Sequence, residues 1–237
     1  MSQAKRSPSA GRVVMISGAS RGIGAAIASR LAADGWLISA GLRNTAMASL
    51  GAPHIACFHD ATDPATEAAW VRETLTHFDR IDAVIASAGI SIPGSILETE
   101  DQDLAQMLQI NVRSPTRLVK AAWPALVAGG QGRVVLLSSM SGKRVKSPRS
   151  STYAISKFAV TGLAAAVRRT GWADGIRSIV VCPGYVATDM TSKVAGWHPE
   201  DMTQPEDIAA MVSATLNLPN NASVSELCFT CQDEDMA

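Results

Sequence analysis

The feature that most constrains the fold of this chain is a regular alternation of short apolar runs with longer, helix-like segments. Continuous Val, Ile and Leu runs separated by helices predict a parallel sheet whose two faces are both covered. Because such crossovers are right-handed, we expect an α/β fold, a Rossmann-type doubly wound parallel sheet of about seven strands with helices on both faces. The expected strands cover residues 12–17, 36–41, 54–58, 83–87, 133–138, 177–182 and 224–229, and the expected helices cover 23–34, 64–78, 101–128, 152–173 and 205–217.

The length and composition of the chain favour one globular body. The chain has 237 residues, of which 47% are hydrophobic and 18% are charged. This length suits one large α/β domain and is short for two full-sized ones. The sequence shows no internal repeat, low-complexity tract or interior linker. We therefore expect a single domain over residues 11–237, preceded by a flexible tail over residues 1–10.

The charge balance says little about macromolecular partners. The formal net charge is zero, so bulk electrostatics predicts neither a nucleic-acid partner nor a membrane surface. No apolar run approaches the roughly 20 residues of a transmembrane helix. The first twelve residues, MSQAKRSPSAGR, lack the apolar centre of a secretory signal. We expect a cytoplasmic protein, and a net charge of zero does little to oppose self-association.

The cysteines raise the question of a redox or metal site. Cys228 and Cys231 form a CxxC pattern, but no second CxxC or His pair completes a metal set. The pair falls in an alternating, strand-like stretch, where a spacing of three residues points side chains to opposite faces. We expect these cysteines to serve packing rather than chemistry, and we expect no metal.

A glycine-rich loop over residues 17–24, SGASRGIG, follows the first expected strand and leads into an Ala-rich helix. Glycines allow a tight turn there and let backbone N–H groups approach a pyrophosphate at a helix N-terminus. A glycine-rich turn without a ligand is the alternative, but the strand–loop–helix context favours dinucleotide binding. The predicted cofactor contacts in this loop are Gly18, Ser20, Arg21, Gly22, Ile23 and Gly24.

The end of the second expected strand indicates which dinucleotide is bound. Residues 40–44 hold no carboxylate for a ribose 2′-hydroxyl, and Arg43 is present instead. Arg21 is a second guanidinium, and two such groups match a 2′-phosphate. Each arginine alone is equally well explained as a solvated loop residue, but together they favour NADP(H). We assign Asp60 to the adenine edge and count the adjacent Ala61 among the cofactor contacts; the alternative for Asp60 is an N-cap or turn residue.

A second polar group lies at the carboxyl ends of later strands. Tyr153 and Lys157 are spaced to share one face of a helix. A nearby ammonium favours the phenolate, so we expect Lys157 to lower the pKa of Tyr153 from about 10 and make it a proton shuttle. Ser138 and Ser139 close the fifth strand, so a hydroxyl there would lie at the carboxyl edge, and Asn111 is placed to hold a water against Lys157. A YxxxK pair alone is often an ordinary surface pair, so the order of all these motifs carries the hypothesis.

In this order the motifs SGASRGIG, SSMSG, YAISK and CPGYVATDM resemble the short-chain dehydrogenase/reductase family over nearly the whole chain. The resemblance implies a catalytic tetrad, and the serine three residues before Gly142 is favoured over Ser138. It also implies further contacts with the cofactor. The implied tetrad is Asn111, Ser139, Tyr153 and Lys157, and the implied cofactor contacts include Ala88, Gly89, Tyr153, Lys157, Pro183, Gly184, Val186 and Thr188.

Two departures from the family pattern bear on the cofactor site. The usual Asn-Asn-Ala-Gly after the fourth strand reads Ala86-Ser87-Ala88-Gly89, which changes two side chains that form hydrogen bonds. The glycine loop starts with Ser17 where Thr is usual, and this change keeps the hydroxyl. Neither departure removes a predicted catalytic group.

These features predict an NADP(H)-dependent oxidoreductase that transfers a hydride between the nicotinamide and a carbonyl or secondary alcohol of a small molecule. The alternative is an NADP-binding sensor without turnover, although a sensor needs no proton relay. The loop over residues 143–149 is basic and either attracts an anionic substrate or is a solvated surface loop. Apolar positions in helices 101–128 and 152–173 lead us to expect a homodimer or homotetramer.

Overall fold

The structure, a computed structural model, describes residues 11–47, 51–192 and 194–233. The tail that we expected over residues 1–10 lies outside the described residues. Among the residues that are described, no helix combines the length and the apolar character needed to cross a membrane.

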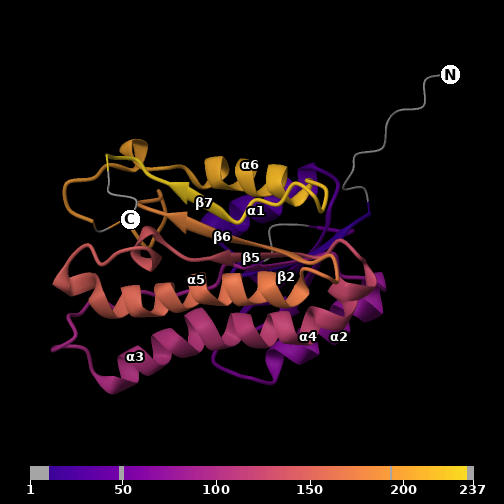
Figure 1. The fold of residues 1–237 in the computed structure, drawn as a ribbon, viewed down its shortest axis with the longest axis horizontal. Coiled ribbons are helices and arrows are strands. Elements are labelled where there is room, and N and C mark those ends of the chain that lie inside the picture. The colour runs from indigo at the N-terminus through magenta and orange to yellow at the C-terminus, as the bar shows by residue number, and fades with distance from the viewer. Residues whose placement is uncertain (1–10, 48–50, 193, 234–237) are drawn as a thin grey trace.

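Seven parallel strands form one sheet in the order β3-β2-β1-β4-β5-β6-β7 (Figure 1). This arrangement confirms the predicted doubly wound, Rossmann-type sheet. Each strand lies within about two residues of its expected position, because continuous apolar runs are the strongest signal of a buried parallel strand. The strands are β1 (Val13–Ser17), β2 (Leu37–Leu42), β3 (Ile55–Phe58), β4 (Ala83–Ala86), β5 (Arg133–Leu137), β6 (Arg177–Pro183) and β7 (Glu226–Phe229).

Helices cover both faces of the sheet (Figure 1). α1 (Gly22–Ala33) and α6 (Pro205–Leu216) lie on one face, and the longer helices α2, α4 and α5 lie on the other. The remaining bounds are α2 (Thr66–Phe78), α3 (Asp101–Leu108), a π-helical turn (Gln109–Arg113), α4 (Ser114–Ala128), α5 (Ser151–Gly171), and 3-10 turns at Thr45–Met47, Met140–Gly142, Pro148–Ser150 and Pro199–Asp201.

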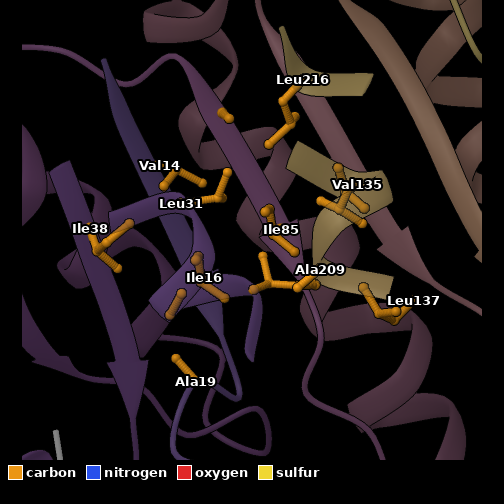
Figure 2. Packing of buried hydrophobic residues seen from close by; sticks show 14 of the residues in the cluster. Val14, Ile16, Ala19, Leu31, Ile38, Ile85, Val135, Leu137, Ala209 and Leu216 are labelled. Carbon is orange, nitrogen blue, oxygen red and sulfur yellow. The ribbon is translucent and has the colours of Figure 1, made fainter. Parts of the chain in front are cut away.

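Two hydrophobic cores sandwich the sheet, because successive side chains of a strand point to opposite faces. Val14 and Ile16 of β1 pack with Leu31 of α1 and Leu216 of α6 (Figure 2). Met15, between them in sequence, joins the other core with residues of α2, α4 and α5. Both cores reach the carboxyl ends of the strands, where Leu42, Leu137 and Val186 join the first core and Ala86 and Met140 join the second.

The prediction of a single helix over residues 101–128 is wrong in one respect. The structure has α3, a π-helical turn over Gln109–Arg113 and then α4 in its place. The reason lies in Asn111, which is buried within that turn and bonds to groups far away in the sequence. A wider helical turn at this point lets the Asn111 side chain reach those partners, and such turns are frequent at functional sites.

The topology creates one crevice at the carboxyl edge of the sheet. β1 and β4 are neighbours, because the chain runs outward through β2 and β3 and then returns to the other side of β1. Loops after β1 and β4 therefore diverge toward opposite edges. Ligands of doubly wound sheets bind at this switch point.

Candidate active site

The glycine loop lies at the switch point and is fixed to the loop after β4. The Ser17 hydroxyl accepts hydrogen bonds from the backbone N–H groups of Ser87 and Ala88, each at 3.2 Å. Gly18 has φ +69°, and a Cβ there would lie 2.8 Å from Ala88 N. A Cβ at Gly24 would collide with the backbone of Gly18. Only bare backbone fits here, so the loop packs tightly between the start of α1 and the loop after β4. The dipole of α1 favours an anion, such as a pyrophosphate, at this end of the helix.

The other residues of the loop differ in their surroundings. Ser20 and Arg21 are exposed, and Ile23 packs against the core beneath α1. Gly22 lies beside Thr188, since a Cβ on Gly22 would be 3.2 Å from Thr188 Cγ2. A groove of about 690 Å3 starts at these two residues and continues between α1 and α6. The segment that follows β6 therefore borders the glycine loop, as the family pattern implies.

Arg21 makes an ion pair that the sequence did not predict. Its Nη1 lies 2.8 Å from Asp189 Oδ2, and the two side chains are 70% and 72% exposed. An exposed pair of this kind contributes about 0–1 kcal/mol, so Arg21 is easily released to another anion.

Arg43 and Asp60 lie near each other beyond β2 and β3. Hydrogen bonds from the backbone and hydroxyl of Thr62 hold the pKa of Asp60 below its usual value, and the charge of exposed Arg43 adds to this effect. Asp60 thus makes the hydrogen bonds of a turn residue, and its contact with the adenine stays a prediction. It is not the N-cap of α2, whose N-cap position is Ala65.

A buried ionic cluster that the sequence analysis missed supports this turn. Glu67 accepts hydrogen bonds from Arg117 at 2.7 and 3.0 Å, and Arg117 also donates to the carbonyl of Ala61 at 3.1 Å. Burial acts to raise the pKa of Glu67, but hydrogen bonds from His59, Arg117 and Ser114 outweigh it and hold that pKa at about 2. The cluster fixes the backbone of Ala61, one of the predicted cofactor contacts. No local motif signals it, because its members come from three separate elements.

Two adjacent serines follow β5 and differ in their hydrogen-bond partners. Ser138 Oγ donates to the carbonyl of Lys157 at 2.9 Å and is buried. Ser139 Oγ instead donates to the carbonyl of Pro183 at 3.3 Å, and its hydroxyl also acts to lower the pKa of Tyr153. The structure thus places Ser139, and not Ser138, beside the tyrosine, and its catalytic role stays a prediction.

Tyr153 and Lys157 lie one turn apart in α5, with Lys157 Nζ 5.6 Å from the centroid of the Tyr153 ring. Burial raises the pKa of Tyr153 to about 12, against a smaller lowering by Ser139. Our expectation that Lys157 lowers this pKa is therefore wrong for the ligand-free chain. Loss of hydration is the main cause of the raised pKa of Tyr153, and burial also lowers the pKa of Lys157 to about 8. Lys157 Nζ donates to the carbonyl of Leu137 at 2.8 Å.

Asn111 lies next to Lys157 and joins three elements. Its Oδ1 accepts from Ile90 N at 2.9 Å, and its Nδ2 donates to Ile90 O at 2.9 Å and to Ser156 Oγ at 3.0 Å. A Cβ on Gly89 would lie 3.2 Å from Asn111 Oδ1 and 3.6 Å from Lys157 Nζ. Gly89 therefore separates the two side chains and leaves room between them. Ser156 is a positioning residue that the sequence analysis passed over, although it lies within the YAISK motif.

The segment after β6 closes the other side of the site. Gly184 N donates to the carbonyl of Phe229 in β7 at 2.8 Å, which fixes the turn that follows Pro183. The Val186 side chain is buried, so only its backbone faces outward from the core. Its carbonyl accepts a 3.4 Å hydrogen bond from Thr188 Oγ1. These contacts place all four predicted residues of this segment along one wall.

Aromatic and basic side chains border this wall. The rings of Tyr185 and Trp197 lie 5.3 Å apart, and Lys146 Nζ lies 4.8 Å from the centre of the Tyr185 ring. Lys143, in the same basic loop, is paired with Glu226 at 2.6 Å. Two of the basic side chains over residues 143–149 thus have partners within the chain.

A glycine loop at the switch point, together with a Tyr and Lys pair at the carboxyl edge, defines a Rossmann-type oxidoreductase. The sequence profile described as short chain dehydrogenase matches residues 12–199. The chain belongs to the short chain dehydrogenase family, as its motifs predicted.

Relatives of known name agree with this assignment. The chain is 38% identical to agropine synthesis reductase of Rhizobium rhizogenes over 94% of its own length, and it spans about half, 53%, of that protein. It is 32% identical to oxidoreductase UcpA of Escherichia coli, over 94% of this chain and 89% of UcpA.

Solved structures show the same fold. An alcohol dehydrogenase of Thermococcus sibiricus, complexed with 5-hydroxy-NADP, superposes with a TM-score of 0.85 at 26% identity, covering 94% of this chain and 99% of that one. A short chain dehydrogenase of Burkholderia cenocepacia in complex with NADP gives 0.83 at 29% identity, covering 94% and 97%.

Proposed function

We propose that this chain is an NADP(H)-dependent oxidoreductase that interconverts a carbonyl and a secondary alcohol in a small molecule. The observation that carries the proposal is that Ser139, Tyr153 and Lys157 lie together at the carboxyl edge of the sheet, the same edge that holds the glycine loop. Bound NADPH would supply the hydride for this reaction.

The cofactor proposal rests on the charges beyond β2. Arg43 is exposed there, and residues 40–44 include no carboxylate that would repel a 2′-phosphate. Arg21 is held only by an exposed ion pair. Two structural neighbours contain NADP or a derivative of it, which supports the same choice.

Ser139 and Tyr153 would bind the substrate oxygen together. Both hydroxyls can donate a hydrogen bond, and two donors at one oxygen stabilise the negative charge that develops there as the carbonyl is reduced. A Tyr153 pKa of about 12 keeps the phenol protonated at neutral pH. Tyr153 therefore holds the proton that the product alcohol needs, which makes it a general acid in reduction.

Lys157 and Asn111 would return that proton. With a pKa of about 8, the Lys157 ammonium is close to the point where it exchanges protons with water at neutral pH. The space at Gly89, between Lys157 Nζ and Asn111 Oδ1, is bounded by a donor and an acceptor. A water there would complete the path to solvent, and oxidation of an alcohol would follow the same path in reverse.

The test is the Tyr153→Phe variant, which removes one hydroxyl and keeps the ring. Loss of a general acid should lower kcat by about 10²- to 10⁴-fold, while the variant still binds NADPH. NADPH absorbance with a panel of carbonyl compounds measures turnover, and fluorescence titration measures binding. Tyr185→Phe removes the only other phenol of the chain and should keep most of the activity. Near-normal turnover by Tyr153→Phe would overturn the proposed relay, and tight NADPH binding with no turnover of any compound would favour the sensor.

A further inference from the structure

A cluster of potential ligands lies between β6 and β7, outside the proposed catalytic and cofactor contacts. Cys182 of β6 is the register partner of Cys228 of β7. Glu226 precedes Cys228 by two residues, so both side chains lie on the same face of β7. The two sulfur atoms and a carboxylate oxygen all lie within 4.8 Å of one another.

The partner of Cys228 is thus a distant cysteine and not Cys231 of the CxxC pattern. Register between neighbouring strands depends on the sheet topology, which a local motif does not report. Cys231 lies beyond the end of β7 and takes no part in the cluster as described.

The cluster already binds a cation of its own chain. Lys143 Nζ lies 2.6 Å from Glu226 Oε1, and the Cys228 thiol donates to the same oxygen at 2.9 Å. Burial raises the pKa of Cys182, and burial together with Glu226 raises that of Cys228 to about 12. In the metal-free chain, the Glu226 carboxylate therefore binds the Lys143 ammonium, and the neighbouring thiols of Cys182 and Cys228 are neutral.

We propose that Cys182, Glu226 and Cys228 form a binding site for a soft divalent metal ion, with Zn²⁺ or Cd²⁺ as the ion that it takes. Zn–S bonds of about 2.3 Å and Zn–O bonds of about 2.0–2.2 Å put the ligands of a tetrahedral site roughly 3.5–3.8 Å apart. The spacing in the cluster needs only a small contraction to reach these values. Thiolate ligands select such ions over Mg²⁺ and Ca²⁺, which prefer oxygen.

Three protein ligands leave the fourth position of a tetrahedron to water or another exogenous ligand. Cys182 is fully buried, whereas Glu226 and Cys228 are partly exposed, so the open position lies on the β7 side. Metal binding replaces the two thiol protons, which are released, and it displaces the Lys143 ammonium from Glu226.

The experiment is a titration of the reduced, chelator-treated full chain with Cd²⁺ and Zn²⁺. We expect one site, an ultraviolet absorption from cadmium–thiolate bonds, and a release of about two protons per ion, measured by calorimetry in buffers of different ionisation enthalpy. Cys228→Ser should weaken binding at least a hundredfold and abolish the absorption. Cys231→Ser and Cys57→Ser are the matched controls, and both should bind as the wild type does.

Lys143→Met provides a second, independent measurement. This variant removes the competing ammonium and keeps a side chain of similar length, so we expect about tenfold tighter Cd²⁺ binding. Circular dichroism verifies the fold of every variant. The proposal would be overturned if Cys228→Ser kept the cadmium–thiolate absorption or if Cys231→Ser lost it. It would also be overturned if Cys182 and Cys228 formed a disulfide before any metal bound. None of these readouts depends on the enzymatic reaction.

Discussion

At the scale of single residues, Arg43 is the side chain that we expect to determine the preference for NADPH over NADH. It is exposed, and its charge acts on the carboxylate of Asp60. A hydrogen bond to a charged group contributes about 1.5–3 kcal/mol, which corresponds to a change in affinity of roughly tenfold to a hundredfold. We therefore expect Arg43→Ala to weaken NADPH binding by that factor and to leave NADH binding unchanged, as measured by fluorescence titration. Arg30→Ala, which removes an exposed arginine from α1, should change neither affinity. Equal losses for both dinucleotides would contradict the assignment.

The buried ammonium of Lys157 should reduce the stability of the ligand-free chain. Burial lowers its pKa from 10.5 to about 8, so the unfolded chain binds more protons between these values and wild-type stability rises with pH in this window. Lys157→Met lacks this dependence. At pH 7 we expect the free energy of unfolding of Lys157→Met to exceed that of the wild type by about 1–3 kcal/mol, and this difference should disappear near pH 10.5. The variant should be almost inactive. Urea unfolding at pH 7 and at pH 10.5 measures the difference. A variant less stable than wild type at pH 7 would show that the bond to Leu137 outweighs the desolvation of the ammonium.

The identity of the polar residues could be predicted from the sequence, but their protonation could not. Tyr153 and Lys157 are recognisable because a spacing of four residues places them on one helix face. The pKa of Tyr153 depends on how much of its hydration is removed by chain segments distant in sequence, and these segments meet only in the folded molecule. The ion pair between Arg21 and Asp189 escaped prediction for the same reason.

At the scale of elements, the strands were predictable and the joint between α3 and α4 was not. An apolar run reports burial directly, whereas the π-helical turn over Gln109–Arg113 exists because Asn111 bonds to Ile90 and Ser156. Helical periodicity cannot reveal such a turn, since one extra residue within a long helix alters the apolar pattern only slightly.

The contact between the glycine loop and α1 gives the element-scale prediction. Gly24→Ala would push a methyl group into the backbone of Gly18, 2.9 Å from its carbonyl carbon. We expect this variant to lose about 2 kcal/mol or more of stability and most of its NADPH affinity, because the loop must move. Gly162→Ala is the matched control, since Gly162 lies in α5 with no atom within 4 Å of a new Cβ. There alanine should add about 0.5–1 kcal/mol by its helix propensity. Thermal unfolding and dinucleotide titration measure both, and unaltered binding by Gly24→Ala would contradict the tight cradle.

At the scale of the whole molecule, the two faces of the sheet bear different helices. α5 presents Ile155 and Phe158, which are 42% and 43% exposed, while α6 on the opposite face presents Met211, which is 45% exposed. Two apolar side chains at one-turn spacing on a long helix form a continuous strip, and a single one does not. The zero net charge offers no general repulsion between copies.

From this asymmetry we expect a homo-oligomer that associates through α5. Light scattering at micromolar concentration should give at least twice the mass of the chain, 24.8 kDa. Phe158→Asp places a charge within the apolar strip, where burial without a partner is costly, and should yield a monomer. Met211→Asp introduces the same charge on the opposite face and should leave a dimer intact. A wild-type monomer would refute the expected association, whereas dissociation by Met211→Asp alone would move the interface to α6. The predicted proton relay lies entirely within one chain. A folded Phe158→Asp monomer should therefore retain Tyr153-dependent turnover, which would show that catalysis does not require assembly.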